Sequence, residues 1–454
     1  MTEILENSKR KRAAIIFTVA LGIILNPLNT SSISLALVRI QGEFGVTFRQ
    51  LAWFISLYYL VSAIANPIMG RLSDLYGRKR YFLFGLALVF MASALAPYSS
   101  NLTMLTVCRA IQAWGCSTVF PAGYGIVRAE ITSDQARALG SLAIFANTAA
   151  AFGPSFGGFL LNSWDWPVVF YINLPLVVGT FILAYKVIPK DTTGQKQQKV
   201  SLDYLGSLLF SLCIIFTMLF LMSIGRSIAI VYMLVTGILF GLFYTYEKKQ
   251  ADPFVNIGEI VKNKGVGLVY LAFLLLNIVF YAVLFGFPSF LQQVWSYSPA
   301  EAGFIMLALA GFSTLVSPYT GKVIDSSGLK IPLIAGVTCL VLGSLGLLGV
   351  VFLASTTFYI AVLAVIGISS GVLNLALQAA LYCFVPTEET GSATGLFMTS
   401  RFTGTIFSSS LLGILFDQII NYRQFSLLAV VCLAIAVVVL LLVIHLNRLI
   451  KIGP

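Results

Sequence analysis

The sequence predicts an all-α polytopic membrane protein, and three observations lead to this class. The chain has 454 residues, of which 58% are hydrophobic and only 10% are charged, whereas soluble domains carry about 25% charged residues. Its mean hydropathy is +0.94. The apolar residues form long runs, and about 20 apolar residues cross a bilayer as one helix. These values exclude a soluble globular protein, a disordered chain and a disulfide scaffold.

Fourteen apolar runs are predicted to be membrane-spanning helices. They cover residues 13–39, 50–70, 79–98, 101–124, 137–161, 166–187, 202–223, 227–247, 264–291, 300–318, 331–354, 357–384, 390–416 and 425–447. We expect the first run to be a span and not a cleaved signal peptide, because it is long and lacks a small-residue cleavage site. The six cysteines lie inside these runs, so we expect them to pack and not to form disulfides.

The distribution of positive charge predicts the orientation. With a cytoplasmic N-terminus, 22 of the 28 Lys and Arg residues fall in cytoplasmic segments, four fall outside, and Arg109 and Arg401 fall within helices. Short cytoplasmic loops are enriched in Lys and Arg. The net charge of +11 therefore reflects topology and gives no reason to expect a nucleic-acid partner. Both termini are predicted to be cytoplasmic.

Two links between helices indicate an internal repeat. Residues 70–80 and residues 321–330 share a Gly, a basic residue, an Asp four residues after that Gly, and a second Gly three residues later. The links follow the second and tenth helices, which fits two six-helix halves with two inserted helices between them. The predicted organisation is an N-terminal half over 1–188, a linker with the two inserted helices over 189–262, and a C-terminal half over 263–454.

Four motifs, taken in their order along the chain, resemble motifs of the major facilitator superfamily, and specifically of its 14-helix drug:proton antiporter branch. Residues 70–80 resemble the superfamily's GxLaDrxGrkr signature, and residues 109–115 resemble its RxxQGxG motif, with Ala113 in place of the first glycine. Residues 153–158 resemble the GPxxGG antiporter motif. Residues 164–175, which contain FYINLP, resemble the branch's entry into its sixth helix.

The resemblance implies a fold, a function and a set of partners. The fold would be the major facilitator fold with 14 transmembrane helices, arranged as six, two inserted and six. The function would be proton-driven multidrug efflux by alternating access in the cytoplasmic membrane. Partners would be amphiphilic drug-like molecules, protons and the bilayer, with a monomeric protein and no cofactor or metal beyond the proton gradient.

The first motif would supply a cytoplasmic gate. The resemblance implies that Asp74 sits beneath the start of the thirteenth helix, near Gly391 and Ser392, because a helix N-terminus stabilises a carboxylate. Arg78 would then pair with Glu130 at the inner end of the fourth helix. The alternative is that these charges only set the orientation of the chain.

The antiporter motif places small residues at helical spacing. Gly153, Pro154, Gly157 and Gly158 allow a facing helix to approach closely, and the proline favours a bend. In the family this packing is thought to seal the protein against proton leak.

Polar residues inside the apolar runs predict a central substrate cavity and a coupling site. A charge in the membrane is costly and marks a functional candidate; the family motif links Arg109 to proton movement, while Arg401 could instead be a structural anchor. The first, fourth, ninth and twelfth helices line the cavity in this superfamily. Their candidate residues, with one from the fifth helix, are Asn26, Asn29, Gln112, Asn147, Asn277, Tyr281, Asn374 and Gln378. Each could instead make only an interhelical hydrogen bond.

One position departs from the family pattern. Asn29 replaces an Asp that drug antiporters of this branch commonly carry in the first helix, and none of the 17 Asp and Glu residues falls in the middle of a predicted span. Proton coupling would then use acids near the helix ends, such as Asp74 and Glu130, or the substrate's own ionisable group assisted by Arg109. A cavity with arginine and no carboxylate should favour zwitterions or weak acids, such as fluoroquinolones, over divalent cations.

The sequence is compatible with one alternative function and argues against another. The same fold could serve a facilitator or importer of a small metabolite, which the missing acid keeps open. An enzyme or receptor is disfavoured, because His445 is the only histidine and no metalloprotease, P-loop or hydrolase motif is present.

Overall fold

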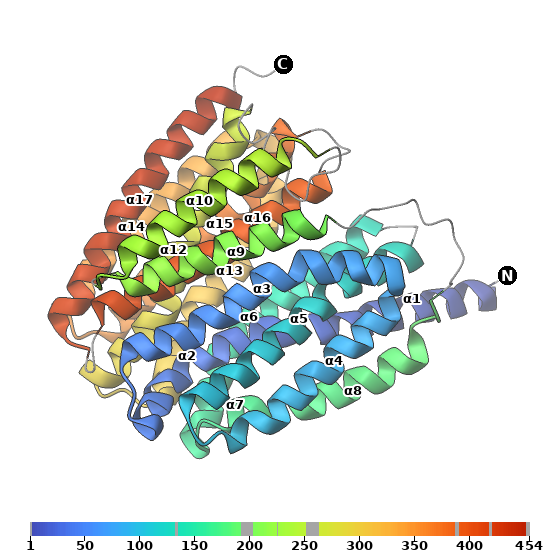
Figure 1. Cartoon of the computed structure of the whole chain (residues 1–454), viewed down its shortest axis with the longest axis horizontal. Helices are drawn as coiled ribbons and strands as arrows, with labels where there is room; N and C mark the ends of the chain where they lie inside the picture. Colours follow the sequence, from blue (N-terminus) through green and yellow to red (C-terminus); the bar gives the residue numbers. More distant parts are fainter. Residues whose placement is uncertain are drawn as a thin grey trace.

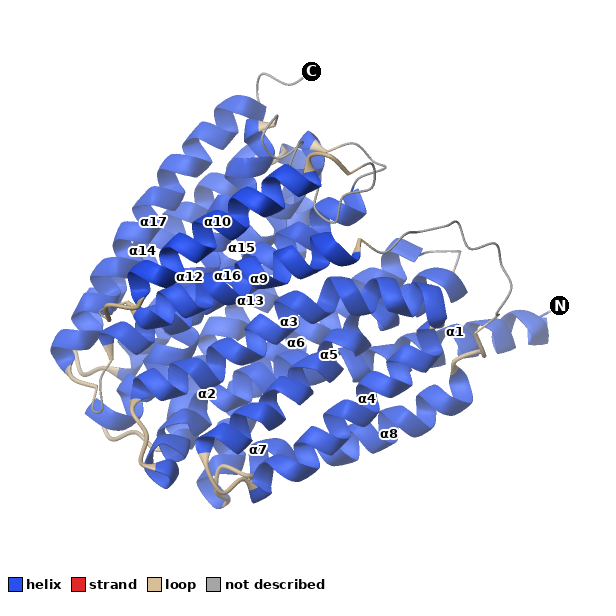
Figure 2. Cartoon of the chain, viewed as in Figure 1, coloured by secondary structure: helices blue, strands red, loops and turns tan. Residues whose placement is uncertain are grey.

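The chain is helical throughout the part that the structure describes. This computed structural model describes residues 2–131, 135–191, 203–224, 226–250, 263–385, 390–416 and 420–450. Helices and short connections make up these ranges, and no strand occurs in them (Figure 2). The predicted all-α class is confirmed.

Each of the fourteen predicted runs overlaps one helix or a consecutive pair, and several helices extend beyond the run. The first group comprises α1 (Thr2–Ile23), α2 (Leu25–Phe44), α3 (Phe48–Tyr76), α4 (Arg78–Leu95) with the short η1 (Ala96–Tyr98), α5 (Leu102–Glu130), α6 (Gln135–Ser163), α7 (Val168–Tyr171) and α8 (Asn173–Val187). The pair that the sequence predicts to be inserted is α9 (Tyr204–Ser223) and α10 (Ala229–Glu247). The last group comprises α12 (Lys264–Val294), α13 (Pro299–Ser327), α14 (Lys330–Val350), α15 (Thr356–Phe384), α16 (Thr390–Leu415) and α17 (Tyr422–Ile450).

The described residues contain eleven stretches that are long and apolar enough to cross a membrane. In this count α1 and α2 form one stretch, and so do α7 and α8. The count covers only the described residues and does not include α5, α6 and α16; α5 carries Arg109 and α16 carries Arg401. The chain is therefore a multi-pass membrane protein.

Two of the predicted spans are broken, and prolines explain both breaks. The first span is interrupted at Ile24, between α1 and α2, and the sixth at Ile172, between α7 and α8. Pro27 cannot donate a hydrogen bond to the carbonyl four residues before it, which belongs to Ile23, and Pro175 has the same relation to Tyr171. Both breaks lie beside asparagines of the candidate site described below.

The two repeated links have the same backbone form. In each, the helix runs past the first glycine and ends at Tyr76 or Ser327, so the turn is made only by the second glycine. Gly77 has φ 114° and Gly328 has φ 74°, values that favour glycine over residues with a Cβ.

The helices before and after the inserted pair form two groups that meet along part of their length. We call them the N-terminal group (α1–α8) and the C-terminal group (α12–α17). Between them, α6 packs against α13, α3 against α16 and α2 against α12. We call the end of the bundle with both chain termini the terminal end and the opposite end the distal end; Figure 1 shows the two groups diverging toward the terminal end.

Hydrogen bonds join the two groups near the distal end. The Gln293 amide donates to Gln41 Oε1 over 3.0 Å, and the Gln292 amide donates to the Leu35 carbonyl over 3.3 Å. Further from that end, the hydroxyls of Ser56 on α3 and Ser409 on α16 are hydrogen-bonded. The distal end is thus closed by direct contact between the groups.

The inserted helices lie against this junction. The helix α9 contacts α3, α16 and α10 (Figure 1). Arg49 at the start of α3 donates to the carbonyls of Met222 and Ile224 at the end of α9, over 2.8 and 2.9 Å. The helix α10 exposes large apolar side chains such as Ile230 and Ile238, which are 64% and 63% exposed, as expected of a helix that faces lipid.

Candidate functional site

A buried arginine heads a chain of hydrogen-bonded amides in the N-terminal group. Arg109 on α5 is 2% exposed, and its Nη1 donates to Gln112 Oε1 over 2.7 Å. The three-residue spacing places the two side chains on one face of the helix. Gln112 Nε2 donates in turn to Asn29 Oδ1 over 3.1 Å and to Ser93 Oγ over 3.0 Å. Three residues that the sequence proposed for the site therefore lie together.

Asn173 completes this chain and was not among the predicted site residues. It is fully buried at the start of α8, and its Nδ2 lies 2.7 Å from Asn29 Oδ1. The FYINLP stretch contains this asparagine, and a polar residue beside a helix-breaking proline was the available signal. Its partner lies 144 residues away, a pairing that a single sequence does not reveal.

Two aromatic rings lie close to the Arg109 guanidinium. The guanidinium carbon lies 4.2 Å from the Tyr58 ring centroid and 5.6 Å from that of Phe54. Tyr58 donates from its hydroxyl to Asn26 Oδ1 over 3.2 Å. Cation–π contact and amide dipoles thus stabilise the charge of Arg109, and no ion pair with a carboxylate is formed by it in the described part of the chain.

The second membrane arginine lies in the C-terminal group and binds a tyrosine. Arg401 on α16 donates from Nε and Nη2 to the Tyr281 hydroxyl on α12, over 3.1 and 2.9 Å. Both residues were predicted to belong to the site, and the structure brings them together.

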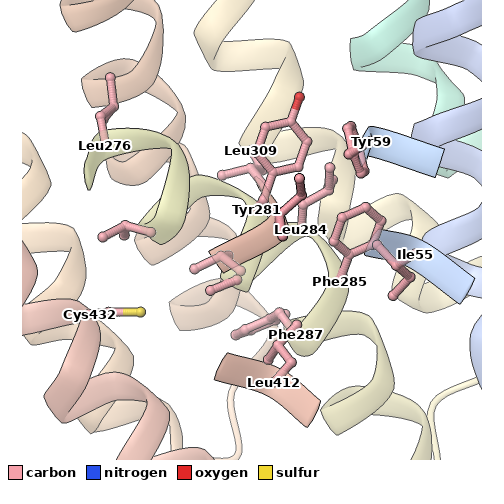
Figure 3. Close-up of a cluster of buried hydrophobic side chains, with 14 of the residues drawn as sticks. Ile55, Tyr59, Leu276, Tyr281, Leu284, Phe285, Phe287, Leu309, Leu412 and Cys432 are labelled. Carbon is pink, nitrogen blue, oxygen red and sulfur yellow. The ribbon is translucent and has the colours of Figure 1, made fainter. Parts of the chain in front are cut away.

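Aromatic rings connect the two arginines across the junction. Tyr59, next to Tyr58 on α3, packs edge-on against Tyr281 with ring centroids 5.4 Å apart, and against Phe285 at 6.2 Å. The rings of Tyr58 and Tyr59 are 5.6 Å apart. Figure 3 shows Tyr59 from α3 beside Tyr281 and Phe285. One arginine from each group therefore flanks a set of tyrosines at the junction.

Other predicted polar residues bond within their own helix. Asn277 Nδ2 donates to the Phe273 carbonyl over 2.7 Å, and Asn374 Nδ2 donates to the Ser370 carbonyl over 3.2 Å. Gln378 donates to the Tyr382 hydroxyl over 3.1 Å, one turn along α15. Asn147 belongs to α6, but its side chain lies outside the described residues.

The GPxxGG residues make the close approach that their size allows. On α6, Gly153 and Gly157 face Ser31 and Ser32 of α2. Gly158 faces the C-terminal group, where a Cβ at this position would lie 2.5 Å from the Pro299 carbonyl oxygen. Pro154, inside α6, presents its carbonyl to Gly303 of α13.

A hydrogen bond accompanies this approach between α6 and α13. Ser155 Oγ donates to the Gly303 carbonyl over 2.9 Å. The motif therefore lies at the junction of the two groups, on the distal side, and connects α2 and α13 to one face of α6.

The gate residues are arranged differently from the expectation. Arg78 pairs with Asp74, with Nε 2.7 Å from Oδ1, and its Nη1 donates to the Gly125 carbonyl over 2.9 Å. The expected ion pair between Arg78 and Glu130 is not formed in the described residues, and Glu130 is exposed. Asp74 is four residues before Arg78, so the local pair forms readily on the helix surface.

The contact expected between Asp74 and the start of the thirteenth helix involves residues outside the described part of the chain. The Asp74 side chain is 57% exposed, and the surroundings of Gly391 and Ser392 lie outside what the structure describes. A different residue caps α4: Asp191 accepts the N–H groups of Lys79 and Arg80 over 3.0 and 3.1 Å.

The described residues offer no cluster for a metal ion. No group of three or more His, Cys, Asp and Glu side chains occurs within them in a suitable arrangement.

Comparison with known proteins gives one family and several transporters. A model of the Major Facilitator Superfamily matches residues 19–409. An uncharacterized MFS-type transporter of Bacillus subtilis, YwoD, is 40% identical over 98% of this chain and 99% of its own length. Multidrug resistance protein Stp of Mycobacterium tuberculosis is 25% identical over 89% of this chain and 76% of its own.

Two further similarities extend this set. Riboflavin transporter RibZ of Clostridioides difficile is 25% identical over 91% of this chain and 90% of its own length. Among solved structures, a peptide transporter POT matches with a TM-score of 0.73 over 97% of this chain and 99% of the other, at 12% identity. The last likeness concerns the fold alone.

Proposed function

Because the chain belongs to the major facilitator superfamily, we propose that this transporter is a proton-driven multidrug exporter of the 14-helix drug:proton antiporter branch. The multidrug name of a relative supports this proposal. So does the GPxxGG stretch, which makes the tight contact between α6 and α13 that an antiporter needs to limit leakage.

The substrate class follows from the charge at the junction, which is the observation that carries the proposal. Arg109 and Arg401 come from opposite groups and flank Tyr59 and Tyr281, and no Asp or Glu lies in the middle of the spans. Arginine binds carboxylates through two parallel hydrogen bonds. Zwitterionic or weakly acidic amphiphilic drugs, such as fluoroquinolones, fit this arrangement better than divalent cations.

The transport cycle would move the two groups against each other. We assign the moving units to residues 1–188 and 263–454, with the linker and inserted helices of 189–262 between them. The basic segments support a cytoplasmic position for both termini, with the protein in the cytoplasmic membrane. With this orientation, the closed distal end would correspond to an inward-facing state, and we propose that the protein works as a monomer.

The proton would be carried outside the middle of the membrane. The amides at Asn29, Gln112 and Asn173 do not titrate, so the candidates are Asp74, Glu130 and the ionisable group of the substrate. Arg109 would assist by stabilising the anionic form of that substrate group. No cofactor is required in this scheme, because the proton gradient supplies the energy.

Two assays in proteoliposomes test the proposal. The first compares the uptake of a fluoroquinolone with that of a bisbiguanide dication under the same pH gradient. We expect preference for the fluoroquinolone, and preference for the dication would contradict the substrate class. The second follows the pH gradient itself, which substrate should dissipate if transport is antiport.

One observation favours a second candidate, a facilitator or importer of a small metabolite. Position 29 carries an amide held by two donors, and a similar protein is named a riboflavin transporter. Transport that proceeds equally with and without a pH gradient would support this candidate.

A further inference from the structure

Asn173 has no role in the function proposed above, yet its side-chain amide makes three hydrogen bonds at the break between α7 and α8. It is fully buried. Its Nδ2 lies 2.7 Å from Asn29 Oδ1, 3.2 Å from the Val169 carbonyl and 3.3 Å from the Phe170 carbonyl. The side chain thus binds its own helix break and, at the same time, a different helix.

The bond to Asn29 fixes the direction of a chain of amides. Asn29 Oδ1 accepts one N–H group from Asn173 and one from Gln112. A reversed Asn29 would turn its NH₂ toward two other N–H donors, which is unfavourable in a buried site. Because Gln112 must present its NH₂ to Asn29, its Oε1 is left to face Arg109 Nη1 over 2.7 Å.

The orientation of the amides matters because some polar atoms in this set of hydrogen-bonded side chains have no hydrogen-bond partner. Among the described residues, Arg109 Nε and Asn173 Oδ1 are buried without a hydrogen-bond partner, and the Cys116 thiol lies next to the Asn29 side chain. Unpartnered buried groups are costly, and they contribute no hydrogen bond that would orient the amides. The bonds that exist therefore determine how Arg109 is oriented.

We infer that Asn173 is a positioning residue: it fixes Asn29 and, through Gln112, presents a hydrogen-bond acceptor to Arg109. The break at Ile172 allows this, because it places an asparagine at the first position of a new helix, facing α2. The inference rests on Arg109 acting in transport, as proposed above, but its main test requires no substrate.

The first test measures how tightly the network is held, using a native thiol. Cys116 lies one turn after Gln112 on α5 and is 2% exposed. In a protein that keeps only this cysteine, N-ethylmaleimide should react about tenfold faster after Asn173→Ala, the factor that corresponds to about 1.4 kcal/mol or one buried hydrogen bond. Thr180→Val is the matched control, because Thr180 is buried on the same helix but donates only to its own Leu176 carbonyl.

A double-mutant cycle separates positioning from simple packing. If Asn173 acts through Asn29, then Asn173→Ala should change the labelling rate less than about twofold in an Asn29→Ala protein. The full tenfold effect in that background would overturn the inference. So would an unchanged rate in the single variant.

A second variant keeps the inference testable if the alanine variant folds poorly. Asn173→Ser retains a hydroxyl that can bond to the Val169 carbonyl, but its side chain is too short to reach Asn29. We expect Asn173→Ser to label as fast as Asn173→Ala. Labelling at the wild-type rate would show that the residue only satisfies the helix break, and would contradict positioning.

Transport gives the functional arm of the test. With norfloxacin in proteoliposomes, Asn173→Ala should lower the maximal rate about tenfold in the wild-type background and less than about twofold in an Arg109→Ala background. Equal losses in both backgrounds would overturn the role. If the wild-type protein does not transport norfloxacin, the proposed substrate class fails, whereas the labelling cycle still decides the role of Asn173.

Discussion

Replacing Gly158 by alanine should open the distal junction. A Cβ at this position would lie 2.5 Å from the Pro299 carbonyl oxygen and 3.2 Å from Gly303 Cα, whereas ordinary contact begins at 3.4 Å. Both neighbours are backbone atoms, so the shortest contact is relieved only if α6 and α13 separate by about 0.9 Å, the difference between 3.4 and 2.5 Å. Overpacking of this kind costs about 1–3 kcal/mol, which would shift a two-state equilibrium about 5- to 150-fold toward the state in which these helices are apart.

The assay for this shift uses a cysteine at the junction. Ser409 is fully buried, and Ser409→Cys in a protein without other cysteines should react slowly with a membrane-impermeant maleimide. Adding Gly158→Ala should raise the labelling rate by at least about fivefold, in line with the smaller of the two costs. Gly179→Ala is the control, because a Cβ at Gly179 on α8 would meet no atom within 4 Å.

The reasoning would be refuted if the Gly158→Ala protein, with a normal elution profile, labelled at the same rate as the Gly179→Ala protein. A lower labelling rate would also refute the reasoning, because it would mean that the added methyl holds the N-terminal and C-terminal groups of helices together.

Three further variants test other parts of the account. Asn29→Asp puts a carboxylate into the amide chain, so the ratio of fluoroquinolone to bisbiguanide uptake in proteoliposomes should fall; an unchanged ratio would argue against charge selection at this site. Tyr281→Phe removes the acceptor of both Arg401 hydrogen bonds and should lower stability by about 1–3 kcal/mol, measured by thermal unfolding against Tyr382→Phe; equal losses would show that the Arg401 bonds contribute little. Asp74→Asn removes one of the proposed proton-carrying acids and should reduce proton-driven transport at normal expression; full transport would show that Asp74 does not carry the proton.

The sequence predicted the helices well, because membrane spans depend mainly on length and composition. It did not predict the interruptions of the first and sixth spans, although Pro27 and Pro175 were visible. An apolar run gives no indication of whether a proline bends a helix or breaks it, because neighbouring helices decide how the freed carbonyl is satisfied.

The candidate site was predicted in part, and the differences have a common physical cause. Arg109 and Gln112 share a helix face, so their contact follows from local spacing. Asn173 was missed because its partner is remote in sequence. The pair of Arg78 with Glu130 was wrong for the described state, since a local partner, Asp74, was available one turn earlier. Contacts between helices depend on the state of the transporter, which the sequence does not specify.

The most direct test of the central claim is the dissipation of an imposed pH gradient by norfloxacin in proteoliposomes, for the wild-type protein and for Arg109→Ala. The account predicts that norfloxacin collapses the gradient faster than a bisbiguanide dication does with the wild-type protein, and that Arg109→Ala abolishes the difference. A gradient that norfloxacin leaves intact, or that the dication collapses faster, would contradict proton-driven export of zwitterionic or weakly acidic drugs through the two arginines.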